Sequence, residues 1–187
     1  MAVDTFAGLI GVLLGVTSIN RLQPSEVRNM MPQLVALLQD SIAGGASVGF
    51  LPPLKNDTAE EFWLKTIDEI EQGVRVLLVS TENGTITGSA QLALATKQNS
   101  VHRAEVQKVL VHSQFRKRGI ARALMNEIDV VARKLGRTTL VLDTEEGSAA
   151  EHLYATCGYV RVGTIPEFAL TTDRSLIATV VFYKLLR

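Results

Sequence analysis

The 187-residue chain has one cysteine, three histidines and no excess of charge of either sign, and each shortage excludes a class of protein. Cys157 alone makes no internal disulfide, so nothing indicates a secreted disulfide scaffold. No histidine has metal-ligand spacing to this cysteine, which argues against a structural metal site. Basic and acidic residues both number 19, and this balance argues against a surface built to bind nucleic acid or an anionic membrane.

The sequence also lacks an apolar run long enough to cross a bilayer. Its best candidate, Phe6–Ile19, is shorter than the roughly 20 apolar residues that a membrane-spanning helix needs. Asp4 precedes it, where a signal peptide has positive residues. We interpret residues 1–16 as an apolar, weakly ordered extension before a single domain over 17–187, and we expect a cytoplasmic protein.

The composition of the chain is that of a folded domain, with 47% hydrophobic and 20% charged residues. A first strand is expected over 17–22. A helix then begins at Pro24, and Pro32 is expected to kink it or divide it in two before it ends at Gly44. Residues 44–56 are expected to form a loop.

Two further helices are predicted from capping boxes, in which serine or threonine is followed three residues later by glutamate. Thr58-x-x-Glu61 predicts a helix over 58–72 whose acidic residues form a solvated face, with Trp63 packing inward. Ser148-x-x-Glu151 predicts a short helix that ends before Gly158.

The remaining segments predict strands and one long helix. Asn83-Gly84 is a strong hairpin signal between two of the strands. Apolar residues from Ile120 to Leu135 have helical spacing, and the strand–helix–strand unit around them predicts two parallel strands. We therefore expect a mixed α/β fold with a mostly antiparallel sheet flanked by helices. The strands are expected over 74–80, 86–94, 103–112, 138–143, 159–165 and 176–185.

The segment Arg116-Lys117-Arg118-Gly119-Ile120-Ala121 joins a strand to the long helix. It lies in residues 101–137, which contain nine Lys or Arg and three Asp or Glu in an otherwise neutral chain. A helix N-terminus offers free N–H groups to phosphate, and a glycine there lets the anion approach the backbone. No P-loop and no Gly-x-Gly-x-x-Gly motif is present. Taken alone, the segment fits a solvated basic helix start better than a phosphate site.

The order of the surrounding elements favours the phosphate site. Arg-x-x-Gly-x-Ala, preceded by VQKVLVH and followed by LYATCGY, resembles the motif of the GNAT superfamily of N-acetyltransferases. Five segments in order are similar to a bacterial resistance acetyltransferase of that superfamily, and the resemblance extends from about Asn20 to Leu185, which implies a GNAT domain over 17–187. These segments are GGASVGF (44–50), SAQL (89–92), RAEVQK (103–108), LDTEEGSAAE (142–151) and YVRVG (159–163).

The resemblance implies acetyl-CoA as the co-substrate, and no metal. In the superfamily a strand splays and its backbone pairs with the pantetheine arm, while the basic turn holds the pyrophosphate. The residues that this implies for cofactor binding are Val109, Leu110, Val111, Arg116, Lys117, Arg118, Gly119, Ile120, Ala121 and Arg122.

Acetyl transfer to an amine also requires loss of a proton from the amine and protonation of the departing thiolate. Glu105 and Gln107 are expected on one strand face, opposite Leu110, and Asp143 ends the next parallel strand. Each acid fits a salt bridge with a nearby arginine as well as a catalytic role. The resemblance favours the catalytic role, through water, and implies Tyr154 as the general acid.

We therefore expect an acetyl-CoA-dependent N-acetyltransferase that acts on a primary amine of a small molecule, such as a toxin or antibiotic-like amino acid, by direct attack in a ternary complex. Two alternatives stay open: a protein or peptide N-acetyltransferase, and a non-catalytic acyl-CoA-binding sensor. No histidine lies beside Cys157, so a covalent acetyl-cysteine is not expected. A homodimer is compatible with the sequence.

Overall fold

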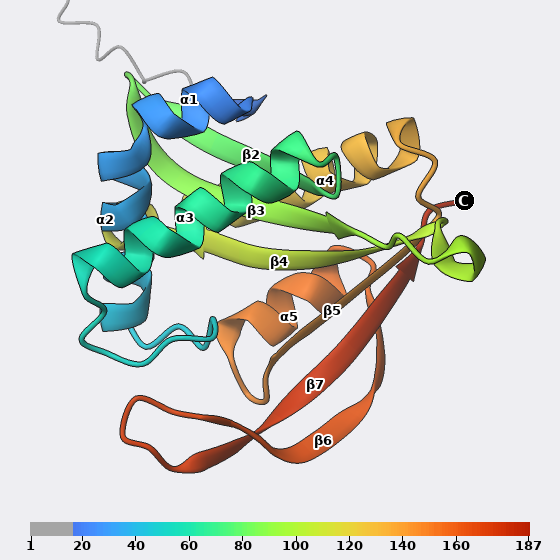
Figure 1. Ribbon diagram of the computed structural model, residues 1–187. Helices are drawn as coiled ribbons and strands as arrows, with labels where there is room; N and C mark the ends of the chain where they lie inside the picture. The colour runs from blue at the N-terminus through green and yellow to red at the C-terminus, as the bar shows by residue number, and fades with distance from the viewer. Residues whose placement is uncertain (1–16) are drawn as a thin grey trace, which may run out of the picture.

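The computed structural model describes residues 17–187, which form a seven-stranded sheet with helices on both faces (Figure 1). The expectation for residues 1–16 lies outside the described residues. The strand order is β1-β2-β3-β4-β5-β7-β6, and only β4 and β5 of this sheet pair in parallel. The predicted mixed α/β fold with one parallel unit is confirmed. Within 17–187, no helix is long and apolar enough to span a membrane.

The strands are β1 (Thr17–Arg21), β2 (Arg75–Glu82), β3 (Thr85–Leu94), β4 (Arg103–Val111), β5 (Thr139–Glu145), β6 (Val160–Leu170) and β7 (Leu176–Leu185). The helices are α1 (Pro24–Asn29), α2 (Met31–Ala43), α3 (Asn56–Glu71), α4 (Ile120–Lys134) and α5 (Ala149–Thr156), and two short 3-10 helices cover Gln98–Ser100 and Ser113–Phe115.

Local signals set most helix ends. Pro24 and Pro32 each lie in a first helical turn, and Met30 separates α1 from α2, so the predicted division is confirmed. The Ser148 hydroxyl accepts the Glu151 amide at the start of α5, as predicted. The capping box predicted at Thr58 is wrong, because α3 already begins at Asn56 without a side-chain cap.

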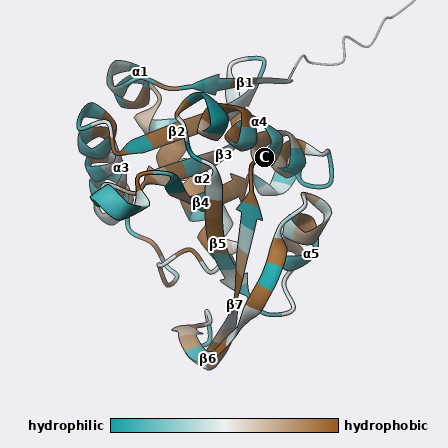
Figure 2. Cartoon of the chain, turned by 90° about the vertical axis from the view of Figure 1, so that its right-hand side faces the viewer, coloured by the Kyte–Doolittle hydropathy of each residue, from teal (hydrophilic) through white to brown (hydrophobic). Residues whose placement is uncertain are grey.

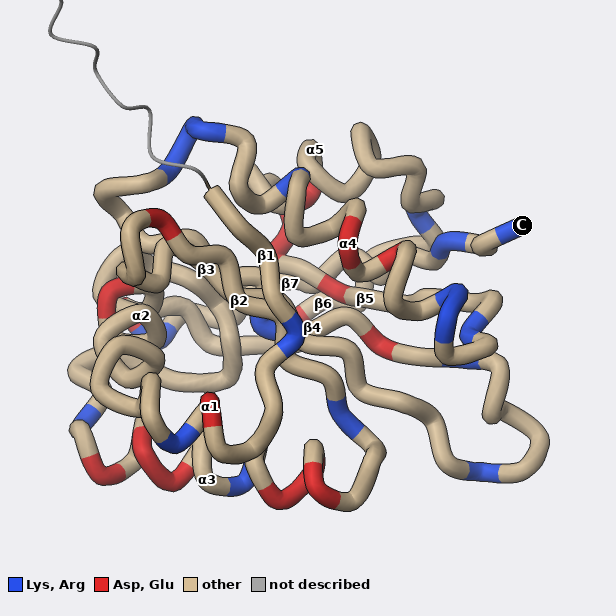
Figure 3. The backbone as a smooth tube through the Cα atoms, turned by 90° about the horizontal axis from the view of Figure 1, so that it is seen from above, with Lys and Arg blue, Asp and Glu red and all other residues tan. Residues whose placement is uncertain are grey.

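A tertiary contact explains the earlier start of α3. Gln39 on α2 donates its amide to the Leu54 carbonyl at 3.0 Å and to the Asn56 side chain at 2.8 Å. This contact fixes the chain just before the helix, so that Thr58 falls inside the first turn and its hydroxyl caps nothing. The solvated acidic face is confirmed, since Figure 3 shows Asp and Glu gathered along α3 and most of them are exposed.

The sheet separates two hydrophobic cores, with α1–α3 on one side and α4 and α5 on the other (Figure 2). Trp63 is fully buried in the core under α1–α3, which confirms its expected packing role. Between β2 and β3, Asn83 and Gly84 have φ of 51° and 78°, as the predicted two-residue hairpin requires.

A β-bulge reverses the faces of β4 at Lys108, whose φ is +50°. Before the bulge, Ala104 and Val106 pack in the core under α4. After it, Leu110 belongs to the core under α1–α3, whereas Val109 and Val111 pack toward α4. The prediction that Leu110 lies opposite Glu105 is therefore wrong, because an extra residue shifts the two-residue alternation by one.

Gly88 on β3 permits the close approach of this bulged strand and α4. A Cβ at position 88 would lie 2.7 Å from the Leu110 carbonyl oxygen and 3.1 Å from Ile120 Cγ2. We predict that Gly88→Ala lowers the free energy of unfolding by about 1–3 kcal/mol in urea titrations, because backbone has to move. Gly163→Ala on β6 is the control, since its Cβ would meet no atom within 4 Å. Equal stability of the two variants would contradict the packing argument.

Candidate active site

β4 and β5 pair over only three residues and then diverge (Figure 1). Arg103–Glu105 pair with Thr139–Val141, and beyond Glu105 the strand β4 keeps its pairing with β3 alone. A cleft of about 550 Å³ opens between the two strands. It is lined by β4 residues 105–109, the end of β5, α5, the loop after α2 and the β6–β7 hairpin.

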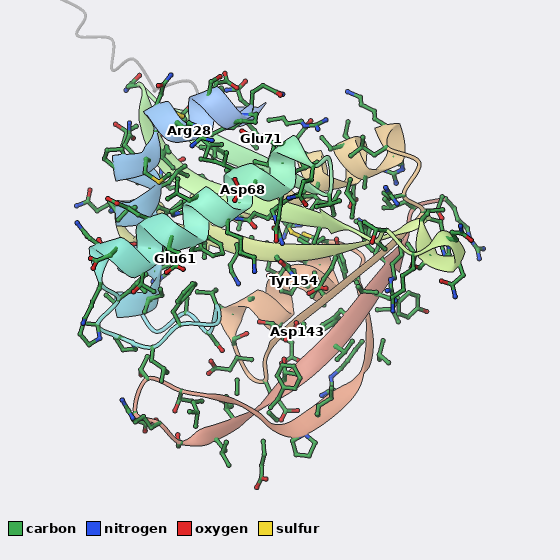
Figure 4. The ribbon with its side chains drawn as sticks, viewed as in Figure 1. Arg28, Glu61, Asp68, Glu71, Asp143 and Tyr154 are labelled. Atoms are coloured by element: carbon green, nitrogen blue, oxygen red, sulfur yellow. The ribbon has the colours of Figure 1, made fainter. Side chains whose placement is uncertain are left out.

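The three predicted catalytic side chains, Glu105, Asp143 and Tyr154, come from β4, β5 and α5 and all line this cleft. Figure 4 shows Asp143 and Tyr154 on the side of β4 where β5 and α5 lie. Glu105 accepts a hydrogen bond of 2.7 Å from Gln107, and Asp143 accepts one of 2.8 Å from Thr179. Among the described residues neither acid pairs with an arginine within 4.0 Å, so the salt bridges considered as an alternative are not formed.

Tyr154 lies on the inner face of α5 and is only 7% exposed. Its ring packs against Phe182 and Tyr159, at centroid distances of 6.3 and 6.0 Å. Burial raises the pKa of the Tyr154 hydroxyl, and the negative charge of Asp143 raises it further. The Tyr154 phenol is therefore protonated at neutral pH.

A hydrogen-bonded chain orients Glu105. The largely buried Arg75 donates to the side-chain oxygens of Gln91 and Gln107, at 2.8 and 2.9 Å, and also pairs with Glu69. Because the Gln107 oxygen is occupied by this guanidinium, its amide nitrogen faces Glu105. The carboxylate thus receives a donor from the protein side of the cleft.

Lys108 is a residue of the cleft that our sequence reasoning missed. Its Nζ lies 5.7 Å from the centre of the Phe62 ring. Burial lowers the pKa of the Lys108 ammonium and the charge of Arg75 adds to this, while Asp143 and Glu105 act in the opposite direction. A signal was present in the sequence, because Gln107-Lys108 places two polar residues in succession where strand alternation calls for one.

In the basic turn, residues 116–121, it is the backbone amides rather than the side chains that are free to bind an anion. Gly119 is the N-cap of α4 with φ of +79°, and Lys117 also has a left-handed backbone with φ of +61°. No side chain caps this end, so the first amides of α4 lack acceptors within the helix. A Cβ at Gly119 would meet no atom within 4 Å, which leaves open space over the turn. Such an end suits a phosphate group.

The arginines of the turn are bound to the protein itself. The Arg116 guanidinium donates to the Val111 carbonyl at 3.2 Å. Arg118 pairs with Glu82 at 2.6 Å and lies 5.3 Å from the centre of the Phe115 ring. Arg122 donates to the Thr156 hydroxyl at 3.0 Å. These contacts rigidify the turn, and direct side-chain contacts to a cofactor stay a prediction.

Asp40 fixes the turn to α2. Its carboxylate accepts the Ser113 amide at 2.7 Å and the Ser113 hydroxyl at 2.6 Å. Burial by itself raises the pKa of Asp40, but the hydrogen bonds from Ser113 and the charges of His112 and Arg116 outweigh it and lower the pKa. The ionised carboxylate is therefore the form that this contact stabilises.

Cys157 is the C-cap of α5 and half-buried. Burial raises the pKa of its thiol, which disfavours the thiolate that a covalent mechanism would need. Its carbonyl accepts a hydrogen bond of 2.6 Å from Lys184, which also pairs with Asp129 at 2.5 Å. The role of this segment is structural. Over residues 17–187, no three His, Cys, Asp or Glu side chains gather as a metal site would require.

Residues 50–159 match the family model of the acetyltransferase (GNAT) family. An "Uncharacterized N-acetyltransferase in hisH-hisA intergenic region" of Azospirillum brasilense is 30% identical over 57% of this chain. The L-amino acid N-acyltransferase MnaT of Escherichia coli is 28% identical over 55% of it. The matches cover 63% and 60% of these relatives, so the chain spans about three fifths of their length.

Among solved structures, the Salmonella typhimurium protein yncA, solved with its cofactor acetyl-CoA, superimposes with a TM-score of 0.73. The superposition covers 92% of this chain and 95% of that one, at 18% identity. This likeness shows that the two chains share a fold.

The Asp40 contact predicts a pH-dependent stability. Because the contact lowers the pKa of folded Asp40 below its ordinary value of 3.8, the contribution of Asp40 to stability is complete above pH 3.8 and is lost as the pH falls through the folded pKa. We predict that Asp40→Asn lowers the free energy of unfolding by about 0.5–1.5 kcal/mol at pH 7, measured by urea titration, and that the difference narrows below pH 4. Asp68→Asn, on the exposed face of α3 (Figure 4), is the control and changes stability little at either pH. A loss of stability in Asp40→Asn that is the same at pH 7 and below pH 4 would contradict the role of the Asp40 charge.

Proposed function

Because the chain belongs to the acetyltransferase (GNAT) family, we propose that it transfers the acetyl group of acetyl-CoA to a primary amine of a small molecule by direct attack in a ternary complex. The observation that carries this proposal is the content of one cleft. There, strand backbone that β5 leaves unpaired lies beside two carboxylates and a protonated phenol. A metal is not part of the proposal.

The proposed acetyl-CoA site runs from the diverging strands to the start of α4. The backbone of Val109, Leu110 and Val111 lies where β4 has left β5, and we assign it to the pantetheine arm and the thioester carbonyl. The pyrophosphate is assigned to the turn, where the free amides and the open space at Gly119 accept an anion without moving the backbone. The residues assigned to the turn are Arg116, Lys117, Arg118, Gly119, Ile120, Ala121 and Arg122.

The proposed chemistry uses the acids and the phenol in succession. The neutral amine attacks the thioester carbonyl, and the proton that it loses passes through water to Glu105 and Asp143. As the carbon–sulfur bond breaks, Tyr154 donates its proton to the thiolate and recovers one from solvent. The Tyr154 phenol is protonated at neutral pH, as a general acid has to be, and its raised pKa makes it a weaker acid than a free phenol.

The walls of the cleft support a small acceptor rather than a peptide. Residues 45–49 line it on one side and residues 168–169 of the β6–β7 hairpin line it on another, and its volume of about 550 Å³ suits a small molecule. The resemblance of five segments to a bacterial resistance acetyltransferase and the name of the MnaT relative both support an amino-acid-like acceptor. More specifically, we propose a toxin-like amino acid as the acceptor. The presence of Glu105, Asp143 and Tyr154 in one cleft argues against a non-catalytic sensor.

Release of CoA thiol tests the function directly. The protein is incubated with acetyl-CoA and a panel of simple amines, free amino acids and peptides, and the thiol is measured together with the acetylated product. We expect release with small amines and strongest release with amino acids. Binding of acetyl-CoA without release for any amine would instead establish a sensor, and release confined to peptides would establish a peptide acetyltransferase.

The turn yields a prediction for cofactor affinity. Gly119→Val places a branched side chain where the phosphate is proposed to lie, and we expect acetyl-CoA to bind more than tenfold more weakly in calorimetry, which is about 1.4 kcal/mol or more. Gly136→Val is the matched control, because Gly136 has a similar φ of +69° at the other end of α4 and is equally open. Both variants suffer the same backbone strain, so an equal affinity loss in both would remove the phosphate assignment.

The buried tyrosines yield a second prediction. Tyr154→Phe removes only the hydroxyl, and we expect turnover to fall by about 10- to 1000-fold with acetyl-CoA affinity nearly unchanged. Tyr159→Phe is the control, because the Tyr159 hydroxyl is buried without a hydrogen-bond partner and does not line the cleft. Single-turnover kinetics place the loss in the chemical step. Parent-like turnover for Tyr154→Phe would show that this residue only packs.

A further inference from the structure

The acetyl transfer proposed above leaves two charged side chains of the cleft without a role, Glu145 and Lys108, and among the described residues that line the cleft Lys108 is the one cation. Lys108 lies on β4 between the acids that receive the amine proton and the backbone assigned to the thioester. We infer that the Lys108 ammonium binds a carboxylate of the acceptor, which makes it the residue that selects amino acids over simple amines. This inference rests on the proposed function.

The backbone conformation and the partial burial of Lys108 both cost free energy, and a role in ligand binding accounts for them. A non-glycine residue at φ of +50° is strained, and such strain collects at functional positions. The side chain is half-buried, and among the described residues its ammonium makes no hydrogen bond or ion pair. Its nearest defined neighbours are the Phe62 ring and Gly49, where a Cβ would lie 3.8 Å from Nζ. Three donors are thus left for an anion.

The neighbouring acids do not take up these donors. Glu105 is held by Gln107, and Asp143 is held by Thr179. Both carboxylates lie more than 4.0 Å from Lys108, although they are near enough to raise its pKa against the effects of burial and of Arg75. Among the residues that line the cleft, Lys108 therefore supplies a positive charge separate from the carboxylates of Glu105, Asp143 and Glu145.

This separation of charge matches a zwitterion. An α-amino acid carries its amine and its carboxylate on one carbon atom, so an amine held near Glu105 and Asp143 brings the carboxylate within reach of a cation on the same wall. A simple amine has no group for Lys108 and leaves the half-buried ammonium without an ionic partner. Gly45–Gly49 line the same cleft, and Gly49 lies next to the ammonium, since a Cβ there would be 3.8 Å from Lys108 Nζ.

The test compares acceptors that differ only in the carboxylate. Each amino acid accepted by the parent protein is paired with its decarboxylated amine and with its carboxamide. For Lys108→Met we expect kcat/KM for the amino acid to fall about 30-fold or more, mainly through KM, while the amine and the carboxamide change little. Lys108→Arg keeps the charge and is expected to restore part of the preference. Lys65→Met on the exposed face of α3 is the control and keeps the parent's preference.

Several outcomes would overturn the inference. If Lys108→Met lowers kcat/KM equally for the amino acid, its decarboxylated amine and its carboxamide, the role of Lys108 is structural. Calorimetry with acetyl-CoA then shows whether the substitution has damaged the cofactor site. A parent protein that prefers the decarboxylated amine would also exclude the carboxylate contact. If Lys108→Met does not fold, Lys108→Gln is measured in its place, with the same acceptor sets. A parent protein that releases no thiol with any acceptor would refute the proposed function itself, which is a different result from loss of selectivity.

Discussion

The divergence of β4 from β5 is the constraint on which the rest of the site depends. A parallel pair that stayed together would satisfy its backbone internally and leave no room beside it. Here the pairing ends at Glu105, and the bulge at Lys108 bends β4 toward β3 instead. The same bulge moves Leu110 into the core under α1–α3, so its position is stabilised by burial of a large side chain on the opposite face. Gly88 completes the arrangement by admitting the Leu110 carbonyl.

Polar contacts from β2, β7 and α2 fix side chains of the cleft and the turn before α4. Arg75 on β2 orients Gln107, Thr179 on β7 orients Asp143, and Asp40 on α2 ties down the turn before α4. Each contact satisfies a polar group that burial would otherwise penalise. The consequence is preorganisation: the carboxylates and the free amides are already placed before any substrate enters, so binding energy is not spent on arranging them.

The sequence alone predicted the features that local chemistry determines. It failed to predict the features that tertiary contacts determine. Prolines divided the first helix and Asn83-Gly84 made the hairpin, because each restricts the backbone by itself. The start of α3 was misplaced because Gln39, distant in the sequence, fixes the preceding loop. Glu105, Asp143 and Tyr154 were found through motif order and do share one cleft. Lys108 was missed because its importance depends on a bulge, and the pattern of a regular strand does not contain one.

Burial and charge together set the proton affinities of Tyr154 and Lys108. Burial disfavours the charged form of each side chain, so it raises the pKa of Tyr154 and lowers that of Lys108. Asp143 acts on both in the same sense, since a negative charge favours a bound proton on either side chain. Burial and the Asp143 carboxylate together keep the phenol neutral, and the same carboxylate partly offsets the effect of burial on the ammonium. The acid that assists loss of a proton from the acceptor in our proposal also maintains the donor for the leaving group and the cation for the carboxylate, which ties catalysis and acceptor choice to the same charge.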